Sequence, residues 1–142
     1  ALYEEGELLS FDKVGLELLK RARDLYLEAF RLNIEDYYPA INVAYLYKII
    51  GGMEAGRGTK LASYIIQAWS NKQGESWWMD ATLAEAELLQ DDFESALELL
   101  NIAIRRHNPS VFDKKATSEQ LKIYAHFTSK IDNVAPLLNV LE

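Results

Sequence analysis

The sequence predicts an all-α protein, built as a tetratricopeptide-like right-handed α-α solenoid of about three helical hairpins plus a C-terminal helix. Three observations support this prediction. Apolar residues recur at helical spacings of three and four, no segment shows the alternation of a strand, and small residues return at repeat-like intervals. The chain has 142 residues, 49% hydrophobic and 26% charged, so we expect one domain over 1–142.

The first helices are indicated by an apolar stripe and by end signals. A strong helix is expected over about 14–32, preceded by a short helix within 2–9 and capped by Ser10 or Asp12. The second begins near 38–39, with Pro39 in its first turn, and ends at the glycines 51–52. These signals place a helix–turn–helix unit at the start of the chain.

Glycine, aspartate and proline signals divide the rest of the chain into further helices. Pro136 is expected in the first turn of a short last helix. The helices before it are expected over about 59–71, 76–90, 93–107 and 110–129.

Alanines at corresponding helical positions indicate an internal repeat. Ala22, Ala62 and Ala96 are separated by 40 and 34 residues, and the second interval equals the usual tetratricopeptide period. Small side chains at such positions let neighbouring helices approach closely, while Phe93 and Leu100 fill the space between hairpins. This recurrence favours a solenoid over a closed bundle.

Three segments carry a more specific resemblance: 22–30 (ARDLYLEAF), 36–44 (DYYPAINVA) and 77–86 (WWMDATLAEA). Together they resemble the TRAFs-binding domain, a helical-repeat family of apoptosis-signal-regulating kinases and of uncharacterised bacterial proteins. The resemblance covers about 5–127. It departs at Ala40, where the family usually has glycine, and over 51–60, which has no counterpart. It implies an intracellular scaffold or regulatory domain, without carrying the binding of TRAFs over to this chain.

Charge and composition narrow the classes of partner. A net charge of −7 argues against nucleic acid and against anionic membrane surfaces. The absence of cysteine suits a reducing cytoplasm, and no apolar run reaches the length of a membrane span. The chain opens on Ala1 and an apolar-rich segment, so we expect it to be a piece of a longer protein.

No motif predicts catalysis, a metal or a cofactor, so we expect a protein that is not an enzyme. The glycine-rich run 51–60 has Thr59 before Lys60, the wrong order for a phosphate-binding loop, and is expected to be a loose loop with Thr59 as helix cap. His107 and His126 lack the spacing of metal ligands; His107 is expected to interact with a helix dipole, with no carboxylate patterned around it.

Carboxylates near the turn at 91–92 are expected to be solvated rather than catalytic. They are Glu85, Glu87, Asp91 and Asp92.

The repeat register instead predicts a protein-binding surface on the concave face. Tyrosine and tryptophan are favoured anchors at interfaces, although core packing is the alternative for these aromatics. Only Lys48 is available to hold a terminal carboxylate, which disfavours a carboxylate clamp. The predicted partner-binding residues are Tyr38, Ile41, Asn42, Tyr45, Lys48, Trp78 and Glu85.

The function expected from these observations is a non-catalytic interaction or regulatory module that binds a peptide or helix of unidentified origin. The alternative is a self-association module within a larger signalling protein, with homo-oligomers formed through apolar residues near the ends of the chain. The candidates for that surface are Leu2, Leu8 and Leu9, or Leu137, Leu138 and Leu141.

Overall fold

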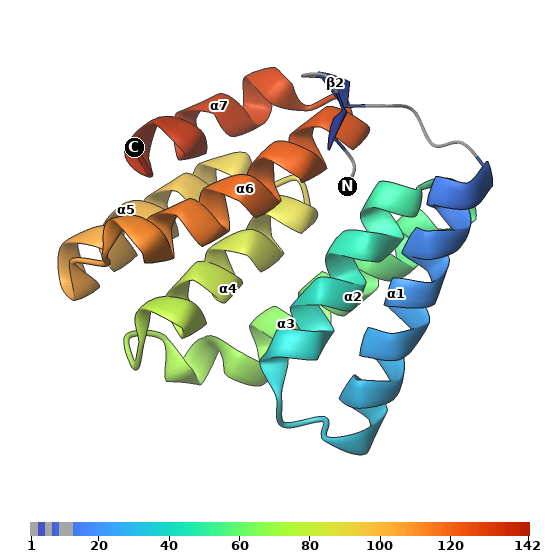
Figure 1. The fold of residues 1–142 in the computed structure, drawn as a ribbon. Helices are drawn as coiled ribbons and strands as arrows, with labels where there is room; N and C mark the ends of the chain where they lie inside the picture. Colours follow the sequence, from blue (N-terminus) through green and yellow to red (C-terminus); the bar gives the residue numbers. More distant parts are fainter. Residues whose placement is uncertain (1–2, 5–6, 9–12) are drawn as a thin grey trace.

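The computed structural model describes residues 3–4, 7–8 and 13–142, and Figure 1 shows their arrangement. The prediction of an all-α protein is confirmed: apart from a two-residue ladder between β1 (Tyr3–Glu4) and β2 (Glu7–Leu8), the regular elements of this part are helical. Two short 3-10 segments, Gly52–Glu54 and Ser70–Lys72, flank α3. The helices are α1 (Lys13–Leu32), α2 (Tyr37–Ile50), α3 (Ala55–Trp69), α4 (Trp77–Leu89), α5 (Phe93–His107), α6 (Val111–Phe127) and α7 (Ile131–Val140).

Side-chain caps explain why four of the helices begin where they do. In each case an aspartate or serine oxygen accepts a hydrogen bond from a backbone N–H two or three residues later, which satisfies a donor that the helix itself leaves free. The predicted starts of α2, α4, α5 and α6 are therefore close to the observed ones. The caps are Asp36, Ser76, Asp92 and Ser110.

The segment 51–60 is not the loose loop that its glycines suggest. The 3-10 segment Gly52–Glu54 leads directly into α3, so Thr59 lies inside the helix and its prediction as the cap is wrong. Gly58 explains the difference, because α3 passes so close to α2 that a Cβ at this position would lie 2.9 Å from the carbonyl oxygen of Ala44. Glycine is here a packing requirement of two helices rather than a helix breaker.

Two further expectations about the ends of the chain are wrong. The described residues within 2–9 form the β1–β2 ladder, with Tyr3 opposite Leu8, and not a helix. The proposed caps Ser10 and Asp12 lie outside the described residues. Pro136 lies in the second turn of α7, which begins at Ile131, so the helix forgoes one backbone hydrogen bond there.

From α1 to α5 each helix packs on the next one along the chain, and α2 lies at the centre of the arrangement. It contacts α1, α3, α4 and also α6, which is remote in the sequence (Figure 1). The paired helices α4 and α5 contact each other, and α7 packs on both α5 and α6. As a result, α6 lies across the side of α2 that also touches α4.

The alanines of the predicted repeat differ in burial between the first helix and the later ones. Ala62, Ala96 and Ala103 are fully buried, whereas Ala29 of α1 is exposed. At the other end of the chain, Leu137 and Leu141 are buried in the core. They therefore do not form the exposed apolar surface that the self-association alternative requires of them.

Candidate functional site

Five of the seven predicted binding residues surround one small pocket of about 190 Å³. Tyr38 and Trp78 stand exposed at its mouth. Its opposite wall comes from α6, whose Gln120 side chain donates a hydrogen bond to Asn42 at 3.5 Å. The predicted residues in this pocket are Tyr38, Ile41, Asn42, Trp78 and Glu85.

Tyr45, the sixth predicted residue, lies in the core rather than on an open surface. The ring of Tyr124 from α6 packs edge-on against it, with the ring centroids 5.9 Å apart. The Tyr45 hydroxyl donates a hydrogen bond to the Glu85 carboxylate at 2.6 Å. Burial raises the pKa of Glu85 to about 7 and also raises the pKa of Glu87. The expectation that these two carboxylates are freely solvated is therefore wrong.

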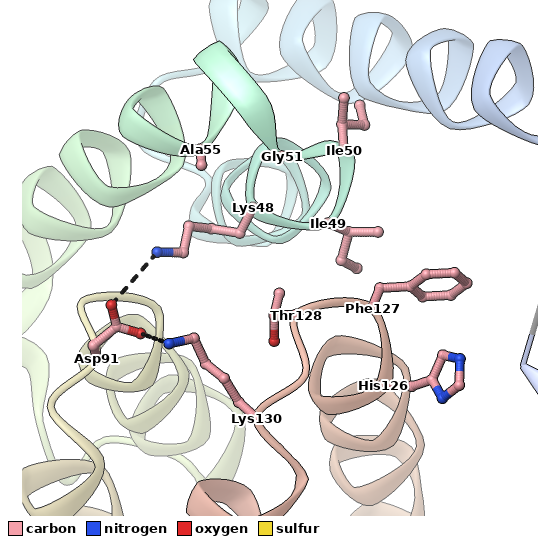
Figure 2. A pocket seen from close by; sticks show the side chains of 10 residues that line it. All are labelled: Lys48, Ile49, Ile50, Gly51, Ala55, Asp91, His126, Phe127, Thr128 and Lys130. Atoms are coloured by element: carbon pink, nitrogen blue, oxygen red, sulfur yellow. Dashed lines mark ion pairs between the residues drawn. The ribbon is translucent and has the colours of Figure 1, made fainter. Parts of the chain in front are cut away.

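Lys48, the seventh, lines a larger cleft of about 730 Å³ at the other end of the same helix (Figure 2). Its ammonium group lies 4.0 Å from Asp91, and the ammonium of Lys130 lies 3.2 Å from the other oxygen of the same carboxylate. Lys48 also donates a hydrogen bond to Thr59 at 3.2 Å. Two cations from distant parts of the sequence thus converge on one half-exposed carboxylate.

The ends of three helices build this cleft. Gly51, Asp91 and Ser129 follow α2, α4 and α6, each with a positive φ, and they are spaced 40 and 38 residues apart. After α4 and α6 the turn is a Schellman motif, in which the N–H groups of Asp92 and Lys130 bond to carbonyl groups five residues earlier. The recurring turn therefore brings Asp91 and Lys130 to the same edge of the molecule.

An apolar wall lies beside the charged groups. Ile49, Ile50 and Phe127 line the cleft, and the His126 ring packs edge-on against Phe127 (Figure 2). The stem of Lys130 reaches over Phe93, with its nitrogen 5.7 Å from the ring centroid. The cleft thus combines cations with apolar surface, the usual composition of a site that binds part of another molecule.

A buried hydroxyl group lies in α6, near Asp91. Tyr124 is fully buried, and its hydroxyl has no hydrogen-bond partner within the described residues. Burial raises the pKa of Tyr124, and the nearby negative charge of Asp91 raises it further.

A second polar cluster joins the start of α4 to the end of α5. The Asp80 carboxylate accepts a hydrogen bond from the backbone N–H of Gly74 at 2.6 Å. It also pairs with His107 at 2.8 Å and with Arg106 at 3.4 Å. The expectation that no carboxylate accompanies His107 is wrong, because the partner comes from the preceding helix. The Asp80 carboxylate is buried and has three partners, which suits a structural role, although the Arg106 side chain is 43% exposed.

Sequence reasoning identified Lys48 and the turn at Asp91, but it did not connect them and it missed Lys130. The sequence signal that could have connected them is their spacing, because about 40 residues separate Gly51 from Asp91 and Asp91 from Lys130. Among the described residues, no three His, Cys, Asp or Glu side chains are grouped as a metal would require. None of the helices in that part combines the length and apolar character that a bilayer crossing needs.

Comparisons with family models, with curated proteins and with solved structures found no match to this chain.

Proposed function

We propose that this protein is a non-catalytic interaction module that binds a peptide segment of another protein, with an acidic group of that segment held in the cleft. One observation carries the proposal: Lys48 and Lys130 converge on Asp91 beside an apolar wall, in an open cleft of about 730 Å³. Charge-assisted hydrogen bonds from ammonium groups are the strong ones for holding a carboxylate.

The local charge supports an acidic partner. The chain as a whole has a net charge of −7, yet the cleft contains two lysines against a single carboxylate. Asp91 is 49% exposed in its side chain and can rotate towards solvent, leaving both ammonium groups to a ligand. A partner carboxylate would then take its place.

The apolar wall supports a peptide rather than a small anion. Ile49, Ile50 and Phe127 offer area to a side chain next to the acidic group. Burial of apolar area supplies most of the affinity at such sites, whereas the ion pair fixes orientation. We therefore propose a motif in which Asp, Glu or a terminal carboxylate neighbours Leu, Ile or Phe.

The architecture is part of the same proposal. Recurring turns after α2, α4 and α6 and buried alanines support a short tetratricopeptide-like array, in which α6 covers the middle of the concave face. We propose the cleft as the main contact and exposed Tyr38 and Trp78 as a second one. Kinship with the TRAFs-binding domain family and a regulatory role in the cytoplasm belong to this proposal as well.

Selection from a random peptide library displayed on phage tests the proposal. We expect the enriched peptides to carry an acidic residue next to an apolar one. Fluorescence anisotropy with one such labelled peptide should show at least about a tenfold loss of affinity in Lys48→Met and in Lys130→Met, because each removes a charged hydrogen bond. Lys122→Met, which changes an exposed lysine on α6 outside the cleft, should bind as the wild type does.

Enriched peptides without acidic residues, or an affinity that both cleft variants leave unchanged, would contradict the proposed site. Failure of the library to yield any binder would contradict peptide binding as the function.

A further inference from the structure

The first helix leaves an apolar stripe uncovered. Of the residues in α1, only Leu19 is buried, and α2 is the helix on which α1 mainly packs, at one side of the molecule (Figure 1). The outward side carries Val14, Leu18, Leu25 and Leu32, with exposed fractions of 68%, 57%, 70% and 82%. Large apolar residues on an ordinary protein surface are scattered singly, so four of them in one line form an unusually large exposed apolar patch.

The stripe has heptad-like spacing, and two charges interrupt it. Leu18, Leu25 and Leu32 follow one another at intervals of seven, and Arg21 and Glu28 occupy the positions between them. At about 100° per residue, these five side chains fall within an arc of roughly 80°. Neither Arg21 nor Glu28 takes part in an ion pair or side-chain hydrogen bond within the described residues.

This pattern is complementary to itself when one copy is reversed. At about 1.5 Å per residue, Leu18 and Leu32 lie equally far, about 10.5 Å, on either side of Leu25. Arg21 lies about 6 Å on one side and Glu28 about 4.5 Å on the other. A second helix placed antiparallel with Leu25 at the two-fold axis would therefore set each Arg21 beside a Glu28.

We propose that the outward face of α1 is a homodimer interface, in which α1 packs antiparallel on α1 of a second copy of this chain. A parallel pair would place Arg21 against Arg21 and Glu28 against Glu28, which like-charge repulsion disfavours. A two-fold interface must be complementary to itself, and the pairing of Arg21 with Glu28 meets that requirement.

The local surface fits such a partner. A shallow hollow of about 570 Å³ lies along this face, and Leu25 of the opposite copy would enter it; its lining residues are Leu18, Arg21, Ala22, Asp24, Leu25 and Glu28. Ala22 and Ala29 flank the stripe on one side, so that the two backbones can approach closely. A single pair of helices buries less than a standard interface, so the dimer is weak and concentration-dependent.

The interface is separate from the peptide site. No residue of α1 lines the cleft around Lys48 and Lys130, so both clefts of a dimer remain open. A dimer would present two such sites. A partner with two acidic motifs would then bind the dimer more tightly than a monomer, because its second motif binds intramolecularly once the first is bound.

Sedimentation equilibrium from about 1 µM to 1 mM, a range that brackets weak association, tests the proposal. We expect a monomer–dimer equilibrium that Arg21→Glu or Glu28→Arg alone weakens at least about tenfold. The double variant R21E/E28R should restore it, because the exchanged charges again face opposite partners. Arg31→Glu, a matched reversal on the same helix outside the stripe, should leave the dissociation constant unchanged.

A monomer at every concentration would overturn the proposal. So would a dimer that both single reversals leave intact, or one that the double exchange does not restore. Leu25→Asp provides a second test. Because Leu25 is exposed, the variant should fold with an unchanged helix content by circular dichroism, whereas its dimerisation should be lost.

Discussion

Helix α4 begins and ends beside a carboxylate that is paired with two basic groups, and the two pairings differ in nearly every other respect. At its start, Asp80 has a side chain 4% exposed, with His107 and Arg106 as partners and the Gly74 N–H as a third donor. Beyond its end, Asp91 has a side chain 49% exposed and two lysines at 3.2 and 4.0 Å. The enclosed pair, at Asp80, joins two helices from within, whereas the open pair, at Asp91, stands at the edge of the cleft.

The largest expected effect tests the enclosed pair. Asp80→Ala should lower the free energy of unfolding by about 3–5 kcal/mol, because it leaves basic groups and a backbone donor without their buried partner. Chemical denaturation followed by circular dichroism measures this. Asp80→Asn, which keeps an acceptor for Gly74, should lose less. A loss below about 1 kcal/mol in the alanine variant would show that the cluster is not structural.

A carboxylate in the middle of α4 allows an intermediate test. Glu85 has a folded-state pKa of about 7, above its ordinary value of 4.5, so the folded protein retains this proton where the unfolded chain loses it. Stability should therefore fall as the pH rises from about 4.5 to 7 and stay level above that. Glu85→Gln should be more stable than the wild type by about 1–2 kcal/mol above pH 7, since one pKa unit corresponds to about 1.4 kcal/mol and the side chain is only partly buried.

Thermal denaturation of Glu85→Gln and wild type over a pH series measures this difference. Below about pH 4.5 the two proteins should be nearly equally stable, because both then carry a neutral side chain in either state. A difference that does not change with pH would show that Glu85 does not titrate in this range.

The smallest expected effect on stability belongs to the open pair. Asp91→Asn should change the free energy of unfolding by no more than about 0.5 kcal/mol, because exposed ion pairs contribute little and asparagine tolerates the positive φ of 63°. The same change should strengthen binding of the selected acidic peptide several-fold, because it removes the carboxylate that competes for both lysines. Anisotropy measures this; weaker binding would indicate that Asp91 itself contacts the ligand.

Local signals in the sequence predicted most of the helices. Apolar periodicity, together with Pro39, the glycines at 51–52 and the turn at 91–92, located α2, α4 and α5 within a few residues. The start of α3 was missed because Gly58 suggests a loop when considered alone. Its purpose depends on the distance between α2 and α3, which is a property of the packed structure.

The candidate site was predictable only in part, for a related reason. Lys48 stood out as a cation on the predicted inner face, and Asp91 as a turn residue. Their meeting with Lys130 depends on α6 lying over α2, which helical periodicity does not specify. The same packing buries Tyr45 beneath Tyr124 and removes it from the surface on which the sequence placed it.

The position of α6 also determines whether a helix from another protein can reach the surface of α2. By covering Tyr45 and facing Asn42, α6 occupies the place along α2 that a docked helix would otherwise take. It is tethered through α5 and α7, so its effective concentration far exceeds that of a free partner in solution. A helix from another protein would therefore have to displace α6, and a truncation that removed α6 would uncover a surface of α2 that the intact chain buries.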